Sequence, residues 1–597
     1  MKQGPVVSHQ WSERLLSPGL ILLAAAVATA PLVLHGFSCG HDFDFHLVSW
    51  MDALDAWRNG IFYPHWAPSA NYGAGEPRFI FYPPLTWMLG AALGGVLGWL
   101  AAPIAMTFLL LLATGLAVRA LARQMLPNGA ATLAGCVAIF SGYALFCVYE
   151  RAAYGELAGG CTIPLALLFV MRERRGDATR QTVWRRALDS SALWLALTIA
   201  VSWLANAPVG VMVCYLLAAV SLTLALMRRS WAPIVRAAAG VTVGLGLAAF
   251  YLVPAAVQQK WAEITEAADD PGLRVKNSFL FARHASAALR DHDIELHKTS
   301  WIAAVMLALT GAAILVCWLR RKMPGERKVW LPLALIPFAV LLLQLPISLP
   351  IWNLLPKLRF LQFPWRWLVV LEAPLGIFLA SAIWVKAGLR RAAVIAISAS
   401  AFVGMAWFAG TRFQQVCDDE DSVTGMTQAY AHGQGFIGTD EYTPQGADDT
   451  LVARGLPPAC LMSDQATALG EATADDPQPT WKAEQGSCDR FPLVASGGEQ
   501  HIRIRGMASH AGYLVLRLRR YPAWNIRVNG EPVTDPGNRE DGLMVVPVPA
   551  GFADVTIDWT TTPDVIVGRW ISVVFSLIAL AAAAGIGFVE HRHRRAA

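Results

Sequence analysis

Charged residues are scarce in this sequence. Only 15% of its 597 residues are charged and 55% are hydrophobic, whereas about 25% charged residues is typical of soluble domains. This composition excludes a disordered chain, a coiled coil and a collagen, and it predicts an integral membrane protein. The formal net charge of +5 is too small to indicate nucleic-acid binding, so no nucleic-acid partner is expected.

Two kinds of motif are also missing. No group of cysteines and histidines has the spacing of a zinc site, and no glycine-rich phosphate-binding motif stands beside a predicted strand. A nucleotide-binding enzyme of the usual kind is therefore not expected.

Hydrophobic runs are abundant. A helix needs about twenty apolar residues to cross roughly 30 Å of hydrocarbon. Twelve crossings are predicted, near residues 20–37, 103–123, 130–148, 154–171, 189–204, 207–227, 232–254, 301–319, 329–346, 367–385, 392–410 and 565–589. The first run lacks the short core and the cleavage site of a signal peptide, so we expect a retained anchor.

The lysines and arginines indicate the orientation of these crossings. If the N-terminus is cytoplasmic, the basic loops all fall on the cytoplasmic side, as the positive-inside rule requires. This holds only if the apolar stretch 83–97 does not cross the membrane, so we expect it to lie on the membrane surface, on the outer side. Residues 44–57 have the spacing of a second, amphipathic surface helix. Both termini are therefore expected in the cytoplasm.

Three parts are predicted along the chain. Residues 1–411 form a transmembrane module with an outer loop at 38–102, residues 412–564 form an outer domain, and residues 565–597 form the last helix and a cytoplasmic tail. From about residue 481, alternating apolar and polar residues with turn signals predict a β-sandwich. The outer domain through Asp476 is expected to be irregular. Cys460 and Cys488 both belong to the outer domain, and they are a candidate disulfide pair.

Ionisable residues are densest directly after the first span, in Cys39-Gly-His-Asp-Phe-Asp-Phe-His46. A carboxylate near lipid is partly desolvated, which raises its proton affinity and suits it to take a proton from a sugar hydroxyl. Aspartate and histidine are also acceptable ligands for manganese or zinc. A third interpretation is that Asp42 or Asp44 only caps the helix that follows.

Arginines also occur on the outer side, against the positive-inside trend. Arg151 stands in the outer turn 149–156 between two glutamates, and Arg359 and Arg366 stand among aromatic residues in 357–367. Because a guanidinium group matches phosphate with two hydrogen bonds, these residues predict an anionic partner in the membrane, such as a lipid phosphate. The alternatives are an interfacial Arg–Glu pair and an ordinary aromatic belt.

Five segments, in this order along the chain, resemble one family of bacterial membrane proteins, labelled 6-pyruvoyl-tetrahydropterin synthase-related. They are Gly40-His-Asp-Phe-Asp-Phe-His46, Phe81-Tyr-Pro-Pro-Leu85, Glu150-Arg-Ala-Ala-Tyr-Gly-Glu156, Leu361-Gln-Phe-Pro-Trp-Arg366 and Glu441-Tyr-Thr-Pro444. The segment Tyr521–Gly530 is similar to the outer β-domain of YfhO-like membrane proteins. More broadly, the sequence resembles the GT-C superfamily of membrane glycosyltransferases, which use sugars carried on polyprenyl or dolichyl phosphate.

The resemblance implies an α-helical, polytopic GT-C-like fold in a bacterial inner membrane, with the active site facing the periplasm. It implies that Asp42 is catalytic, with Asp44 as the second choice. The residues expected to bind the donor phosphate or the substrate are His46, Arg151, Glu156, Lys260, Arg359, Gln362 and Arg366. No metal ligand is assigned and no cofactor is required, although a divalent cation is compatible with the chemistry.

The predicted function is an inverting glycosyltransferase that moves a sugar from a polyprenyl-phosphate donor to a glycan, lipid or protein acceptor. Asp42 would take the acceptor proton, and arginines would stabilise the leaving phosphate. The alternative is a transporter or flippase for a lipid-linked glycan, or a non-catalytic assembly partner. Transporters place ionisable residues near the bilayer midplane, whereas these spans are almost free of charge apart from Glu372.

Overall fold

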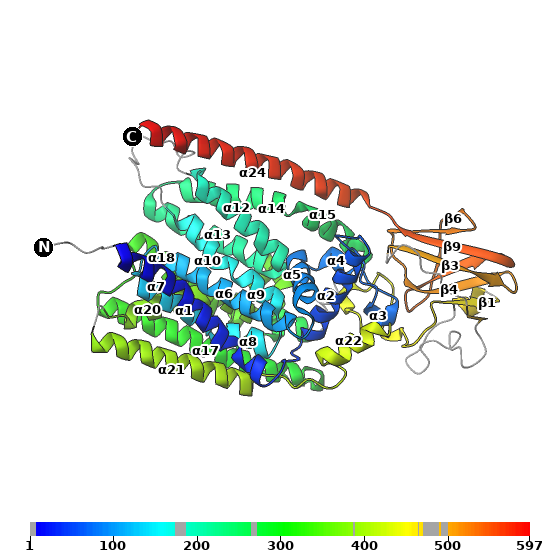
Figure 1. Ribbon diagram of the computed structural model, residues 1–597, viewed down its shortest axis with the longest axis horizontal. Helices are drawn as coiled ribbons and strands as arrows, with labels where there is room; N and C mark the ends of the chain where they lie inside the picture. Colours follow the sequence, from blue (N-terminus) through cyan, green and yellow to red (C-terminus); the bar gives the residue numbers. More distant parts are fainter. Residues whose placement is uncertain are drawn as a thin grey trace.

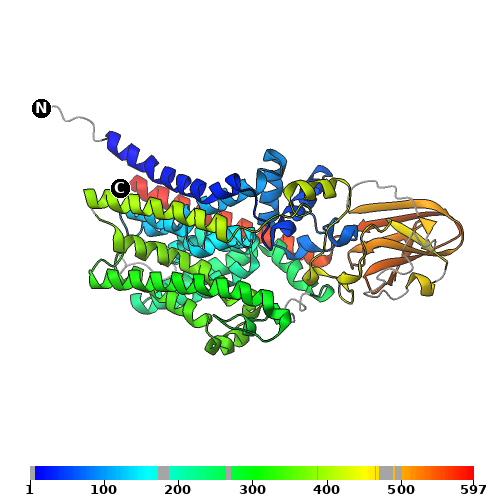
Figure 2. The same cartoon turned by 90° about the horizontal axis from the view of Figure 1, so that it is seen from below.

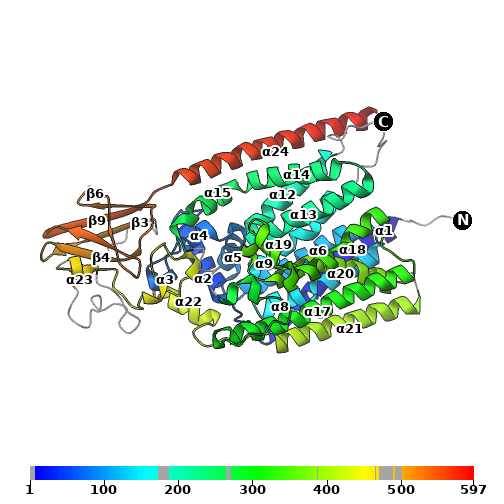
Figure 3. The ribbon, with the colours of Figure 1, turned by 180° about the vertical axis from the view of Figure 1, so that it is seen from behind.

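A computed structural model describes residues 7–172, 187–263, 271–385, 388–463, 465–469, 489–490 and 500–596. Its helices form an elongated bundle, and its β-strands gather at one end of that bundle (Figure 1). The start of α1 (Val7–Leu34) and the end of α24 (Pro563–Ala596) lie at the opposite end. Figures 2 and 3 show the same separation from two other sides.

The bundle contains most of the helices of the chain. Besides α1 and α24 they are α6 (Ala102–Ala122), α7 (Asn128–Ile139), α8 (Gly142–Tyr149), α9 (Tyr154–Gly160), α10 (Thr162–Met171), α12 (Ser190–Ala205), α13 (Ala207–Arg228), α14 (Ala232–Leu247), α15 (Ala249–Gln258), α17 (Arg290–Leu319), α18 (Arg327–Leu343), α19 (Leu349–Leu354), α20 (Leu368–Ile383) and α21 (Leu389–Arg412).

Within the described residues, 8 helices are long and apolar enough to cross a membrane, or up to 11 if each bent pair counts as one span. The bent pairs are α7 with α8, α14 with α15, and α18 with the segment Pro346–Leu354, at 40°, 75° and 93°. The last bend follows from Pro346, which has no backbone N–H to continue α18. Helix α12, with 16 residues, matches the remaining predicted span. The polytopic helical fold is confirmed, and the count of twelve stays a prediction.

Two helices of the outer loop lie between the bundle and the β-strands (Figure 1). They are α2 (Phe43–Arg58) and α5 (Pro84–Leu97), and their bounds agree closely with the two predicted surface helices. They pack tightly, because a Cβ on Gly90 of α5 would come within 2.2 Å of the Trp50 ring of α2. With 14 residues, α5 is shorter than the roughly twenty residues of a spanning helix.

The polar face of α2 is buried, although its amphipathic pattern predicts an exposed one. Ser49 and Asp52 are both almost fully covered. The Asp52 carboxylate accepts a hydrogen bond from Ser69 Oγ at 2.7 Å. Arg78 Nη1 donates to Ser49 Oγ at 3.0 Å, and Arg78 Nε lies 2.6 Å from Glu76 Oε1. The outer loop therefore folds back over α2 and supplies hydrogen-bond partners for Ser49 and for one carboxylate oxygen of Asp52.

Two antiparallel sheets form the C-terminal β region. Their strand orders are β2-β1-β4-β8-β7 and β3-β9-β5-β6. The strands are β1 (Ala459–Met462), β2 (Asp489–Arg490), β3 (His501–Ala508), β4 (Gly512–Arg519), β5 (Trp524–Val528), β6 (Glu531–Val533), β7 (Gly537–Asn538), β8 (Leu543–Val548) and β9 (Gly551–Trp559). Apolar side chains from both sheets, such as Leu514 and Ile557, share one core cluster with Trp66 of the outer loop. The β region is thereby packed onto the outer loop.

The β region starts earlier than predicted. Strand β1 precedes residue 481 and pairs with β4, and the segment expected to be irregular also contains α22 (Val423–Ala431). All four residues of β1 are buried, so the alternation that reveals a half-exposed strand is missing from its sequence. A C-terminal β-sheet region is confirmed, whereas the sandwich and the three-part division stay predictions. Cys488, and with it the candidate bond to Cys460, lies outside the described residues.

Candidate active site

The loop before α2 is fixed to the outer turn between α8 and α9. The Asp42 N–H donates to the Arg151 carbonyl at 2.9 Å. Gly40 lies so close to this turn that a Cβ on it would be 2.5 Å from the Glu150 carbonyl oxygen. The same loop is also fixed to the segment after α21, because Cys39 forms a disulfide with Cys417. The first outer loop is thus held between two parts of the chain that are remote from it in sequence.

Asp42 occupies the N-cap position of α2, but its side chain makes no capping hydrogen bond. Its Oδ1 atom lies 2.8 Å from Nδ1 of His41, and its Oδ2 atom lies 3.6 Å from Nη2 of Arg151. Burial alone would raise the pKa of Asp42, but the His41 hydrogen bond and the Arg151 charge together hold it well below its usual range. The expected increase in proton affinity is therefore wrong for Asp42, which is ionised at neutral pH, whereas desolvation raises the pKa of Asp44 as expected.

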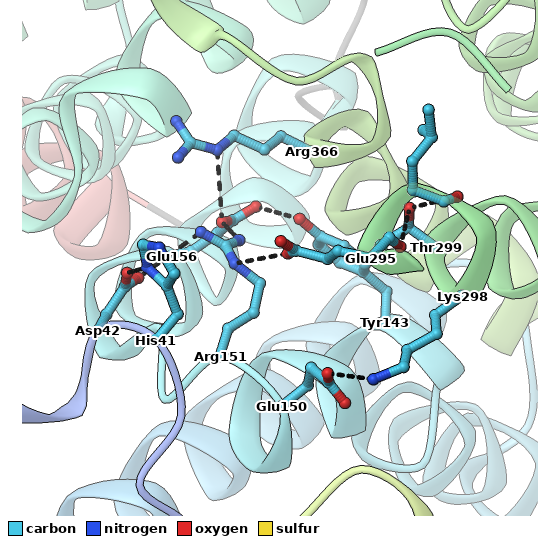
Figure 4. Close-up of polar contacts among 11 residues, drawn as sticks. His41, Asp42, Tyr143, Glu150, Arg151, Glu156, Glu295, Lys298, Thr299 and Arg366 are labelled. Atoms are coloured by element: carbon cyan, nitrogen blue, oxygen red, sulfur yellow. Dashed lines mark hydrogen bonds and ion pairs between the residues drawn. The ribbon is translucent and has the colours of Figure 1, made fainter. Parts of the chain in front are cut away.

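Arg151 is the centre of the polar network in Figure 4. It contacts three carboxylates. Its Nη1 atom lies 2.8 Å from Glu156 Oε2, its Nε atom lies 3.9 Å from Glu295 Oε1, and Asp42 is the third partner. The Tyr143 hydroxyl donates to the other oxygen of Glu156 at 2.5 Å. Arg151 and Glu156 are both buried, so their charges are screened little by water.

Arg366 brings a second guanidinium group to this network. It stands in the short helix η7 (Pro364–Trp367), and its Nε atom lies 3.8 Å from Glu156 Oε2. That distance is too long for a hydrogen bond, and Nε is buried without any hydrogen-bond acceptor among the described residues. The guanidinium carbon lies 5.2 Å from the centre of the Phe363 ring. Arg366 therefore retains hydrogen-bonding capacity for an anion beside Arg151.

Asp44 and His46, on the same helix as Asp42, do not join the network. Asp44 is exposed, and its Oδ1 atom accepts the N–H of Phe45 at 2.7 Å. His46 is buried against the rings of Tyr82 and Tyr154. Burial lowers the pKa of His46 to about 4, so its ring is neutral. His46 therefore packs among aromatic rings, and its predicted contact with a substrate stays a prediction.

Three of the predicted binding residues lie outside the network. Lys260 is exposed over the ring of Trp261, with 5.3 Å from Nζ to the ring centre. Arg359 is exposed and donates from Nη2 to the Asn353 side chain at 2.7 Å. Gln362 ends the helix η6 (Leu358–Leu361) with a φ of 61°. Their predicted roles stay predictions.

Several network members were missed by the sequence analysis. His41 lies inside the analysed motif, and Tyr143 lies on α8. Glu295 and Lys298 belong to the first turns of α17, which extend beyond the apolar span that begins near residue 301. Lys298 Nζ lies 2.5 Å from Glu150 Oε1. The acidic and basic residues of the segment 290–298 were the available signal, because they continue the helix outward from the membrane.

A metal ion has no evident ligand set in the described part of the chain. No group of three or more histidine, cysteine, aspartate or glutamate side chains there is arranged to hold one. The positive charge next to Asp42 and Glu156 comes from Arg151 and Arg366.

Two solved structures are similar to this chain. They are crystal structures of the Archaeoglobus fulgidus oligosaccharyltransferase, one in complex with Zn and sulfate and one in the apo form. The identities are 14% and 13%, the TM-scores are 0.37 and 0.39, and the matches cover 70% and 71% of this chain. They cover 57% and 60% of that protein, so this chain spans less than two thirds of its length.

No curated protein matches the sequence. A family model described as "6-pyruvoyl-tetrahydropterin synthase related domain; membrane protein" matches residues 79–411. This match covers more than half of the chain and includes Arg151, Glu156 and Arg366. The chain therefore belongs to the family of 6-pyruvoyl-tetrahydropterin synthase-related membrane proteins, as its sequence motifs predict.

Proposed function

We propose that this protein is a membrane glycosyltransferase that moves a sugar from a polyprenyl-phosphate carrier to a glycan, lipid or protein acceptor. One observation carries the proposal, namely that the acid–base pair His41–Asp42 and the guanidinium groups of Arg151 and Arg366 belong to one connected network. Transfer from a phosphate needs a group that takes the acceptor proton and positive charge that stabilises the leaving phosphate. The network supplies both.

The proposed reaction is a single displacement. The acceptor hydroxyl gives its proton to the His41–Asp42 pair and attacks the anomeric carbon on the side opposite the phosphate, so the configuration inverts. The bond from the anomeric carbon to the phosphate oxygen breaks, and the electron pair leaves with the phosphate. The phosphate is a stable anion, so it departs without protonation. Arg366 and Arg151 stabilise its charge, and no cofactor is needed.

Arg366→Ala is expected to weaken the binding of undecaprenyl phosphate to the purified protein by about ten- to a hundredfold. A hydrogen bond to a charged group contributes about 1.5 to 3 kcal/mol, and each 1.4 kcal/mol corresponds to about tenfold in affinity. Equilibrium binding in nanodiscs measures the change. Arg58→Ala, at an exposed arginine that ends α2, is the matched control and should bind like the wild type.

Unchanged affinity in Arg366→Ala would contradict the phosphate site. The wild type should also consume a polyprenyl-phosphate hexose when a panel of acceptors is supplied. Binding of undecaprenyl phosphate without any consumption of donor would favour a transporter or flippase, for which the buried Glu372 in α20 would be the residue to test next.

The site is proposed to face the periplasm of a bacterium, with both chain ends in the cytoplasm. The start of α1 and the end of α24 lie at one end of the bundle, and α2, which Asp42 precedes, lies toward the β region (Figure 1). In intact cells, a cysteine placed at Glu531 in β6 should react with a membrane-impermeant maleimide. A cysteine at Gln124, after α6, should not react until the cells are opened. If the maleimide labelled Gln124→Cys in intact cells, the proposed orientation would be wrong.

A further inference from the structure

His41 and Asp42 are consecutive residues, yet their side chains turn toward each other at the start of α2 (Figure 4). The distance from His41 Nδ1 to Asp42 Oδ1 is 2.8 Å. We propose that His41, rather than Asp42, takes the proton from the acceptor hydroxyl, and that Asp42 is the positioning residue that holds the imidazole ring. This inference rests on the proposed glycosyl transfer and names the atom that receives the proton.

Asp42 is poorly placed to accept that proton. One carboxylate oxygen is occupied by His41, and the other faces the guanidinium group of Arg151 at 3.6 Å. Arg151 is itself buried and fixed by its 2.8 Å contact with Glu156. Protonation of Asp42 would leave the buried Arg151 cation without this negative partner and would weaken the hydrogen bond to His41. The lowered pKa of Asp42 reflects this cost. A carboxylate in this setting orients a histidine better than it accepts a proton.

His41 has the complementary properties. Its side chain is 80% exposed, whereas that of Asp42 is 29% exposed. When the ring is neutral, the Nδ1–H donates to the Asp42 carboxylate, so the lone pair is on Nε2. Among the described residues, the imidazole ring of His41 makes its hydrogen bond through Nδ1, to Asp42, and Nε2 has no partner there. An acceptor hydroxyl can therefore reach Nε2 from outside while the carboxylate fixes the tautomer.

Three charged groups face the imidazole. They are Asp42 on its own loop, Glu295 at the start of α17, and Arg151 in the turn before α9. The hydrogen bond to Asp42 raises the pKa of His41. Partial desolvation by the surrounding protein lowers it, and the carboxylates of Asp42 and Glu295 outweigh the charge of Arg151. The pKa therefore lies above the ordinary value of 6.5. Because the neutral ring is the active form, transfer should decline as the pH falls through this raised pKa.

The hydroxyl oxygen forms a bond to the anomeric carbon while its proton passes to Nε2 of His41. The anomeric carbon–phosphate oxygen bond breaks, and both electrons stay on the polyprenyl phosphate beside Arg366 and Arg151. The resulting imidazolium is paired with Asp42, and it then releases the proton to water.

The test compares purified wild type, His41→Ala and His41→Gln in nanodiscs from pH 5 to 9. Two readouts are undecaprenyl phosphate binding and consumption of a polyprenyl-phosphate hexose. Both variants should bind the lipid phosphate with about the wild-type affinity but consume donor about 100- to 10,000-fold more slowly. His41→Gln keeps a donor toward Asp42, so it separates loss of the base from loss of local structure. The acidic decline of the pH profile should disappear, and added imidazole should restore part of the His41→Ala rate.

A matched control exists in the β region, where His501 of β3 is paired with Asp558 of β9. His501→Ala removes a histidine from a similar pair and should leave the rate and the pH profile unchanged. If His41→Ala keeps more than about a tenth of the wild-type rate and the same acidic decline, a group other than His41 takes the proton and the inference is wrong. If the wild type itself consumes no donor at any pH, the proposed function fails, and that outcome is visible before any variant is compared.

Discussion

Asp42→Asn is expected to lower the rate of sugar transfer by about 100- to 10,000-fold while the protein stays folded. Asparagine has the size of aspartate but carries no charge. It cannot accept a proton, and it stabilises an imidazolium on His41 poorly, so the loss is expected whichever of the two residues takes the proton. Donor consumption by purified protein measures the effect. The acidic decline of any remaining activity should move to lower pH, because the main cause of the raised pKa of His41 is gone.

Folding should be nearly unaffected by this substitution. Losing a helix cap costs about 0.5 to 2 kcal/mol, but the Asp42 side chain makes no capping hydrogen bond. Asp55→Asn, the same change near the other end of α2, is the matched control and should keep the wild-type rate. Wild-type turnover in Asp42→Asn would rule out its role. If Asp44→Asn then abolished transfer, the catalytic carboxylate would be Asp44.

Arg151→Ala is expected to destabilise the protein by about 3 to 5 kcal/mol, because it removes one partner of a buried ion pair and leaves the other charge uncompensated. The Glu156 side chain is 5% exposed and would keep its negative charge. Its remaining cationic neighbour would be Arg366, whose Nε atom lies 3.8 Å away. Thermal and denaturant unfolding in detergent measure the loss. Arg366→Ala should cost much less, because Arg366 makes no hydrogen bond to Glu156. Arg151 is therefore expected to act mainly on stability, and Arg366 on phosphate binding.

A double variant sharpens this prediction. Glu156→Gln removes the unpaired charge, so Arg151→Ala combined with Glu156→Gln should be more stable than Arg151→Ala alone. The two side chains are in contact, so their effects should not add. Arg151→Lys should retain part of the stability, because it keeps the charge but not the forked geometry of the guanidinium. If Arg151→Ala had the same free energy of unfolding as the wild type, the three carboxylates would not need this arginine to remain buried in the folded protein.

Local patterns predicted the parts of the site that are close together in sequence. The apolar spacing of residues 44–57 located α2, and the dense segment around Asp42 marked one half of the network. Arg151 and Glu156 are five residues apart across one turn, so an Arg–Glu pair was one expected alternative there, and the structure shows which of the two glutamates is the partner. Hydrophobic length likewise located the apolar helices that are long enough to cross a membrane, because lipid imposes the same requirement on each of them.

Contacts between remote segments could not be predicted in this way. Glu295 reaches Arg151 only because α17 continues beyond its apolar span, and no period in the sequence shows where a helix stands relative to its neighbours. The buried polar face of α2 was missed for a related reason. Ser49 and Asp52 look solvent-exposed until Arg78 and Ser69 are placed against them. Buried polar groups are predictable only when their partners are known.

The disulfide between Cys39 and Cys417 has a consequence for the order in which the protein is made. The two cysteines are 378 positions apart. In the proposed orientation, the loop with His41 and Asp42 reaches the periplasm soon after synthesis begins, whereas Cys417 follows only after α21 has been inserted. The disulfide therefore cannot form until most of the chain has been translated. A nascent chain would hold no finished site, and the disulfide itself forms and persists only in a compartment that oxidises thiols.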